Sequence, residues 1–249
     1  MAINQEVNNS IYEEYGDRWY TAYDDPIALL RAENKTKFPW ILQRLNLEYP
    51  QGAWVLDVGC GGGFLSNELA LHGHKVSGVD LSPESLRVAA SYDKTTTVNY
   101  QVADAYKLPF PDASFDVLTA MDFLEHVDRP SDVIKEFGRV LRPGGLFFFH
   151  TFNRNPLAWL VIIKLLEWFI KNTPKNMHVI NLFIKPKELK QYCLKAGMEV
   201  DSLTGIRPVF SSIDWPMVRT GIVAKGMKFK LTKGSMLSYM GCAKKWPQQ

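Results

Sequence analysis

The chain has 249 residues, of which 46% are hydrophobic, and its formal net charge is only +3 at pH 7. This length and composition predict one domain around a large core, and the absence of a basic block argues against a nucleic-acid partner. Three scattered cysteines and an N-terminus without basic and apolar signal regions predict a cytoplasmic protein.

Residues 1–50 are predicted to form a helical segment before the first strand. Its aromatic residues stand in a stripe at Tyr12, Tyr15, Trp19 and Tyr20. Stripes of this kind usually pack in a core. Because this one precedes the first strand, it more specifically suggests a cap that covers a bound ligand and excludes water.

A glycine-rich run follows, WVLDVGCGGGFL from Trp54 to Leu65, and it predicts a cofactor site. A buried strand carries Asp57 near its end, and glycines that include Gly59, Gly61 and Gly63 lead into a helix. Glycine permits positive φ and close approach of a ligand, and the helix presents free N–H groups. A dinucleotide fingerprint needs a further glycine where Phe64 stands, whereas Asp57 suits a cationic ligand such as a sulfonium.

Two further strands are predicted to end in carboxylates. Residues 75–79 lead to Asp80, followed by Leu81, and a carboxylate there can accept both hydroxyls of a ribose. Residues 99–102 lead to Asp104, followed by Ala105, where an adenine amino group could be bound. Alternatively, Asp104 caps the next turn.

The remaining pattern alternates strands and helices. We expect an α/β fold, with a seven-stranded, mostly parallel Rossmann-like sheet and helices on both faces. The further predicted segments are strands near 115–120, 145–151, 198–204 and 236–243 and helices near 64–72, 83–91, 130–141 and 186–196. In a single domain 1–249, residues 51–152 would form the cofactor-binding core, 153–184 a helical insertion or lid, and 185–249 a C-terminal helix and strands.

The order of these motifs resembles that of the class I S-adenosylmethionine (SAM) dependent methyltransferases. Motif I of that class, acidic-x-G-x-G-x-G, begins here at Asp57, and Asp80, Asp104 and the strand near 115–120 follow in the family's order. The resemblance implies that SAM is the cofactor.

A polar group after the fourth strand, Asp122-Phe-Leu-Glu125-His126, is the candidate catalytic site. His126 could remove a phenolic proton, because its ordinary pKa lies near 6.5. Alternatively, Asp122, Glu125 and His126 could hold a divalent cation such as Mg²⁺ that orients the acceptor hydroxyl. A third interpretation is a cluster of polar residues at a helix start.

Several motifs narrow the resemblance to the ubiquinone-biosynthesis O-methyltransferases. These are GCGGGFLS, MDFLEHV, LRPGG, TFNRNPLAWL and FIKPKEL. The family methylates a polyprenyl-hydroxyphenol and a demethylubiquinol, so the resemblance implies a phenolic or quinol acceptor that carries a prenyl chain.

The resemblance also implies roles for individual residues. It places divalent-cation dependence on Asp122, Glu125 and His126, although the family usually has Glu at the first position. Met121 corresponds to a SAM-contacting residue. Lys37 stands where the family has an arginine that contacts the cofactor carboxylate. A lysine cannot form the two parallel hydrogen bonds that an arginine makes to a carboxylate. The resemblance further places Asn153 and His178 on the acceptor side. The family has an Asp after this histidine, and the present chain has Val179 there.

The insertion contains an apolar segment, PLAWLVIIKLLEWFI at 156–170, which is too short to span a bilayer. Leaving about eight large apolar side chains in water would forfeit roughly 10–20 kcal/mol, so the segment is expected to bury itself. It could be a core helix, a lid on the acceptor, or a peripheral contact with the inner face of the membrane through Trp159 and Trp168.

The sequence therefore predicts a SAM-dependent O-methyltransferase. One alternative keeps the fold and methylates another lipid or aromatic molecule, on oxygen or carbon. Two others are a SAM-binding regulator without catalysis and a nicotinamide-dependent oxidoreductase, which Phe64 disfavours.

Overall fold

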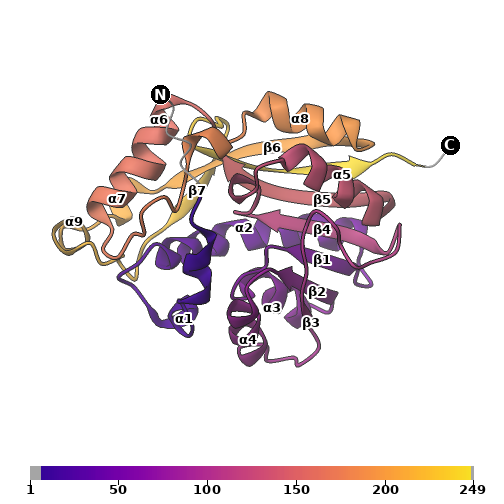
Figure 1. The fold of residues 1–249 in the computed structure, drawn as a ribbon, viewed down its shortest axis with the longest axis horizontal. Coiled ribbons are helices and arrows are strands. Elements are labelled where there is room, and N and C mark those ends of the chain that lie inside the picture. The colour runs from indigo at the N-terminus through magenta and orange to yellow at the C-terminus, as the bar shows by residue number, and fades with distance from the viewer. Residues whose placement is uncertain (1–6, 248–249) are drawn as a thin grey trace.

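The computed structural model describes residues 7–247, which form one mixed sheet with helices on both faces (Figure 1). The strand order is β3-β2-β1-β4-β5-β8-β6-β7. The first five strands in this order are parallel, and β8, β6 and β7 are antiparallel to their neighbours. The prediction of an α/β, mostly parallel sheet is confirmed.

The strands and helices lie close to their predicted positions. The strands are β1 (Trp54–Val58), β2 (Lys75–Asp80), β3 (Asn99–Val102), β4 (Phe115–Met121), β5 (Leu141–Phe152), β6 (Met198–Pro208), β7 (Phe229–Thr232) and β8 (Ser238–Lys245). The α-helices are α1 (Arg18–Thr21), α2 (Ile27–Glu48), α3 (Phe64–Leu71), α4 (Pro83–Ser91), α5 (Pro130–Val140), α6 (Pro156–Ala158), α7 (Leu166–Phe169), α8 (Pro186–Lys195) and α9 (Trp215–Thr220).

The described sheet has eight strands, so the prediction of seven was wrong. The additional strand is β7, four residues that pair only with the edge of the sheet at β6. Its sequence, Phe-Lys-Leu-Thr, alternates too briefly to give a strand signal, and pairing with β6 supplies the order that its own sequence does not.

Helices cover both faces because successive strand residues point to opposite sides of the sheet. On one face, Phe147 and Phe149 of β5 pack in a cluster with residues of α5 and α8. On the other, Phe148 packs in a cluster with residues of α2 and α3. Both faces of β5 are buried, which is typical of a central strand and explains its continuous apolar run.

The N-terminal residues form two parts, a small aromatic cluster that packs against α4 and the core helix α2. The 3₁₀ helix η1 (Asn9–Glu13) and α1 pack against α4 in a small aromatic cluster that includes Trp19. The later half of α2 belongs to the main core, because Ile41 and Leu45 are fully buried beneath the sheet. The residues that precede α2 therefore lie over the ends of β1 and β2, and α2 itself is a core helix.

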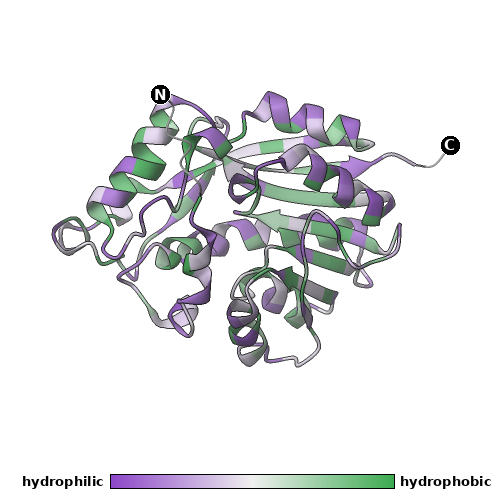
Figure 2. Ribbon diagram, viewed as in Figure 1, coloured by the Kyte–Doolittle hydropathy of each residue, from purple (hydrophilic) through white to green (hydrophobic). Residues whose placement is uncertain are grey.

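The apolar segment 156–170 forms α6, a π-helical stretch at Trp159–Leu165, and α7 (Figure 2). The expectation that it buries itself was wrong in part. Ile163 and Ile170 are buried, but Trp159 remains 41% exposed and Trp168 65% exposed. One side of the segment faces a cavity, and the other faces solvent. Among the described residues, no helix has the length and hydropathy needed to cross a membrane.

Candidate active site

A cavity of about 450 Å³ lies beyond the carboxyl ends of β1, β2 and β4, where α/β sheets bind their ligands. Most predicted cofactor residues line it: Asp57, Gly59, Gly61, Asp80, Leu81, Asp104, Ala105 and Met121. Gly63 and Lys37 do not. Gly63 is the N-cap of α3 with a φ of +78°, and Lys37 is buried beside the second cavity described below.

The loop between β1 and α3 requires glycine for its packing as well as its conformation. Gly59 and Gly61 have φ angles of +67° and +50°. A Cβ at Gly59 would lie 2.3 Å from the Phe123 ring, and one at Gly61 would lie 2.7 Å from the Trp19 ring. The two aromatic rings therefore sit directly against the glycine backbone, and Trp19 covers this side of the cavity.

The acidic residues of the cavity are held by hydrogen bonds. Asp57 accepts from the Ser66 and Thr119 hydroxyls, both at 2.6 Å. Burial nevertheless raises the pKa of Asp57 to about 6. Asp80 accepts from the backbone N–H groups of Gly61 and Ser82, each at 2.9 Å, and burial raises its pKa as well.

Asp104 is exposed and accepts from the Tyr106 N–H at 2.9 Å. Its carboxylate thus stabilises the local turn while it faces the cavity. A glycine cradle with three carboxylates fits a cationic nucleoside such as SAM.

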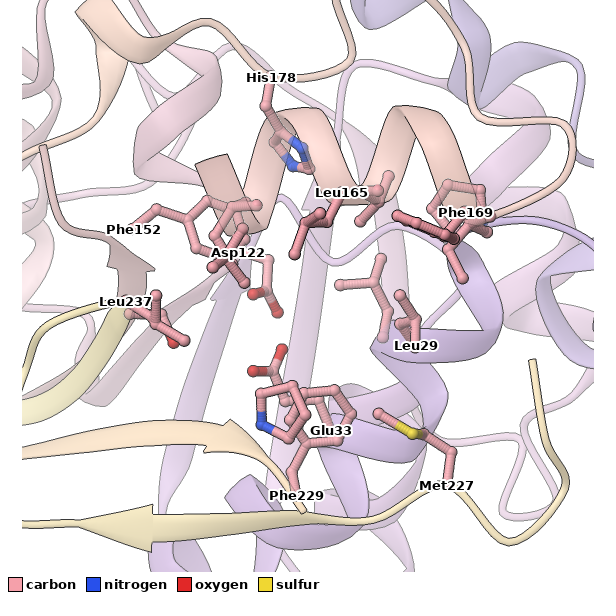
Figure 3. Close-up of a pocket in the computed structure, with 18 of the residues that line it drawn as sticks. Leu29, Glu33, Asp122, Phe152, Leu165, Phe169, His178, Met227, Phe229 and Leu237 are labelled. Atoms are coloured by element: carbon pink, nitrogen blue, oxygen red, sulfur yellow. The ribbon is translucent and has the colours of Figure 1, made fainter. Parts of the chain in front are cut away.

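A second cavity of about 380 Å³ adjoins the first and is almost entirely apolar (Figure 3). Its apolar lining comes from α2, the 156–170 segment and the C-terminal region: Leu29, Ile162, Leu165, Phe169, Ile206, Met217, Met227, Phe229 and Leu237 are examples. The carboxylates of Glu33 and Asp122 approach each other within it, and His178 points into it (Figure 3).

Four residues line both cavities: Tyr12, Leu30, Asp122 and His126. Asn153 and Trp159, which were also predicted on the acceptor side, lie outside both cavities. Asn153 donates to the Ser235 carbonyl at 2.7 Å and fixes the loop before β8, and Trp159 lies on the solvent side of its segment. Neither lines the apolar cavity.

The three side chains predicted as metal ligands do not converge. Asp122 binds Lys37, the buried Glu125 accepts from the Thr151 hydroxyl at 2.8 Å, and the His126 ring is bonded to Tyr12 and Asn9. Since each carboxylate is turned to a different partner, Asp122, Glu125 and His126 do not fit a shared divalent cation. Burial and, secondarily, the Asp122 charge raise the pKa of Glu125 to about 8.

His126 is held as a neutral imidazole at the junction of the cavities. Its Nδ1 lies 3.1 Å from the Asn9 amide oxygen, and its Nε2 lies 3.3 Å from the Tyr12 hydroxyl. A proton on Nδ1, donated to Asn9, leaves Nε2 free to accept. Burial lowers the pKa of His126 to about 4 and that of His178, whose ring centroid is 5.5 Å away, to about 3.

A buried charged cluster beside the apolar cavity was not predicted. The Lys37 Nζ donates to both Asp122 oxygens, at 2.8 and 2.6 Å, and lies 2.8 Å from Glu33 Oε2 and 3.0 Å from His150 Nδ1. Burial alone would lower the pKa of Lys37, but the two carboxylates raise it above its ordinary value. Burial would likewise raise the pKa of Asp122, but Lys37 and His150 hold it below its ordinary range.

The sheet and its glycine-lined, acidic cavity define a SAM-dependent methyltransferase of class I, and a family model described as a methyltransferase domain matches residues 56–149. A ubiquinone biosynthesis O-methyltransferase from Azoarcus sp. is 38% identical over 199 residues, which cover 78% of this chain and 83% of the relative. Another from Nitrosococcus oceani is 36% identical over 82% of this chain and 86% of its own. The chain belongs to the family of the ubiquinone biosynthesis O-methyltransferases.

Solved structures support the fold at lower identity. Magnesium protoporphyrin IX methyltransferase from Synechocystis, with bound SAH, gives a TM-score of 0.64 at 18% identity, covering 96% of this chain and all (100%) of that one. A SAM-dependent methyltransferase from Methanosarcina mazei gives 0.59 at 23% identity, covering 85% and 99%. Both similarities concern the fold alone.

Proposed function

We propose that this chain transfers the methyl group of SAM to a phenolic hydroxyl of a prenylated quinol precursor, as the names of its relatives suggest for ubiquinone biosynthesis. The observation that carries the proposal is the junction of a polar, cofactor-type cavity with an apolar one at Tyr12, Leu30, Asp122 and His126. SAM, when bound, supplies an electrophilic methyl group on a sulfonium. The junction aligns an acceptor oxygen with that methyl, and alignment supplies much of the rate.

His126 is the proposed general base. Its Nε2 faces the junction, and its lowered pKa keeps the ring unprotonated at neutral pH. A phenolic hydroxyl that takes the place of the Tyr12 hydroxyl at Nε2 could pass its proton to the ring. Asp122 stands four residues before His126 and, as an ionised acceptor, can bind a second hydroxyl of the ring or stabilise the imidazolium that forms.

The apolar lining supports a prenyl substituent. Each buried CH₂ group contributes about 0.8 kcal/mol, so one five-carbon isoprene unit that enters this cavity should improve affinity by more than tenfold. Cavities of this size bury most of a drug-sized ligand, which leaves room for a substituted ring and a short part of a prenyl chain.

An acceptor screen with labelled SAM tests the proposal. We expect O-methyl products from catechols with and without a single prenyl group, with a KM for the prenylated member at least about tenfold lower. Mass spectrometry separates O-methyl from C-methyl products. Equal kcat/KM for the two catechols would refute prenyl recognition, and methylation only at carbon would refute the reaction type.

We further propose that the solvent side of the 156–170 segment contacts the membrane surface, where a prenylated acceptor resides. Leu157, Trp159, Leu160 and Trp168 are all at least 39% exposed, and none of them lines the apolar cavity. Lys164 lies among them and is paired with Glu167 at 2.7 Å, so the apolar side chains carry the proposed contact.

Flotation with anionic liposomes tests this contact in the Trp159→Ser, Trp168→Ser double variant. The matched control replaces Trp54 and Trp246, which are 48% and 49% exposed but lie at the other end of the strands, where β1 begins and β8 ends. Binding should fall in the first variant and persist in the control. Equal binding by both variants would contradict the proposal.

A further inference from the structure

The buried charged cluster beside the apolar cavity resembles a metal site in which the Lys37 ammonium group takes the place of the metal ion. Ligand atoms of Glu33, Asp122 and His150 lie within 4.8 Å of one another, a spacing that would suit a metal ion. The Lys37 Nζ lies between them, within 3.0 Å of an atom of each. The position that a metal ion would need is taken by an ammonium group.

The cluster acts directly on Asp122, which lines both cavities. Asp122 has a φ of +55°, a left-handed conformation that costs an L-residue energy unless its surroundings hold it. Its backbone N–H donates to the His150 carbonyl at 3.2 Å, and its side chain is gripped by Lys37 and by His150 Nδ1 at 2.5 Å. Lys37 and His150 therefore fix where this carboxylate faces the acceptor.

The position of the Lys37 ammonium group is fixed by burial and by the helix that carries it. Its side chain is 2% exposed, and it projects from α2, a 22-residue helix whose later half is anchored in the core. Its Glu33 partner stands one turn earlier on the same helix. A divalent ion could join the same ligands only by displacing the ammonium, because like charges at this separation repel strongly in a buried site.

We propose that Lys37 is a built-in cation that positions Asp122 at the acceptor side of the site, in the place where a metal ion would otherwise be required. Lys37 acts through Asp122 and is a positioning residue. It follows that transfer by this chain proceeds without a divalent cation, and that removing the lysine opens a metal site of Glu33, Asp122 and His150. The turnover arm of the test rests on the proposed function, whereas the metal-binding arm needs no acceptor.

The test compares the full chain with its Lys37→Ala variant after exhaustive dialysis against EDTA. Titration calorimetry with Mn²⁺ should detect one site per chain in Lys37→Ala and no such site in the wild type. Mn²⁺ should also raise the melting temperature of Lys37→Ala and leave that of the wild type unchanged. Adding Asp122→Asn to Lys37→Ala should abolish Mn²⁺ binding, which assigns the site to this cluster.

The kinetic arm separates positioning from cofactor binding. Dialysed wild type should keep its turnover, whereas Lys37→Ala should lose about tenfold or more in kcat/KM for the acceptor, the effect of one lost charge-assisted hydrogen bond. Its Kd for SAM should stay unchanged. Lys37→Arg should recover part of the loss without Mn²⁺, and Lys35→Ala, an exposed lysine on the same helix, should match the wild type.

Three results would overturn the proposal. The first is a dialysed wild type that loses turnover and regains it with one Mg²⁺ or Mn²⁺ per chain. The second is a Lys37→Ala variant with an unchanged acceptor KM and a weakened SAM affinity, which would make Lys37 a cofactor ligand. The third is a folded Lys37→Ala variant that binds no Mn²⁺. Should Lys37→Ala fail to fold, the dialysed wild type and its Mn²⁺ titration decide alone. If no tested acceptor is methylated, the Mn²⁺ titrations still decide the question.

Discussion

Gly61→Ala should weaken SAM binding because it displaces Trp19 from the loop. An alanine at the φ of +50° costs about 1–2 kcal/mol in backbone conformation. Its Cβ would also lie 2.7 Å from the Trp19 ring, whereas carbon atoms in contact are normally about 3.5–4.0 Å apart. The ring must move by about 1 Å, and overpacking of this kind typically costs a further 1–3 kcal/mol. We expect SAM affinity, measured by calorimetry, to fall about tenfold or more.

Gly144→Ala is the matched control, because it separates the backbone cost from the collision. Gly144 has a φ of +79°, but a Cβ there meets no atom within 4 Å. It stands near the start of β5, at the end of the strand away from the cofactor cavity. Gly144→Ala should therefore lose about 1–2 kcal/mol of unfolding free energy and keep its SAM affinity. The reasoning fails if Gly61→Ala binds SAM as tightly as this control does.

The further predictions concern three titratable residues, His126, Asp80 and Glu125. His126→Ala should lose a factor of about 10²–10⁴ in kcat while it retains SAM affinity. Because burial lowers the pKa of His126 to about 4, turnover of the wild type should persist on acidification through the ordinary histidine pKa, and a loss near 6.5 would contradict a buried base. Asp80→Asn replaces one acceptor oxygen beside two N–H donors, so calorimetry should show SAM affinity lower by about 1–3 kcal/mol. For Glu125, whose pKa is raised to about 8, the folded protein keeps a proton that the unfolded chain releases near 4.5, so stability should fall as pH rises between these values. Glu125→Gln should flatten that slope in urea unfolding, and an unchanged slope would show that Glu125 is ionised in the folded protein.

The fold of the core could be predicted because its strands carry their own signals. β1 and β5 contain the apolar runs 54–56 and 146–149. Asp57 and Asp80 stand at the same end of neighbouring parallel strands, so their convergence on one cavity follows from topology. β7 gave no such signal, because a four-residue edge strand is defined by its partner. The π-helical stretch at Trp159–Leu165 also lacked a signal, since its apolar residues are compatible with an ordinary helix.

The side-chain directions of the polar group could not be predicted from spacing. Asp122, Glu125 and His126 are close in sequence, yet the positive φ of Asp122 and the 3₁₀ turn after it send the three side chains to different partners. The Lys37 cluster depends on the contact of α2 with the end of β5, which brings residues more than 80 positions apart together. Its one visible trace was Glu33 and Lys37 at i,i+4 spacing on a helix face that is otherwise apolar.

The junction of the two cavities is assembled from two distant parts of the chain, and this has a consequence for catalysis. Asp122 and His126 follow β4, whereas Tyr12 and Leu30 come from the N-terminal 30 residues. Tyr12 and Asn9 both bond to the His126 ring, and the Trp19 ring lies against the glycine loop. The N-terminal segment therefore both orients the proposed base and covers the glycine loop. In the proposed reaction, an acceptor that displaces the Tyr12 hydroxyl from His126 lies at the junction of the two cavities.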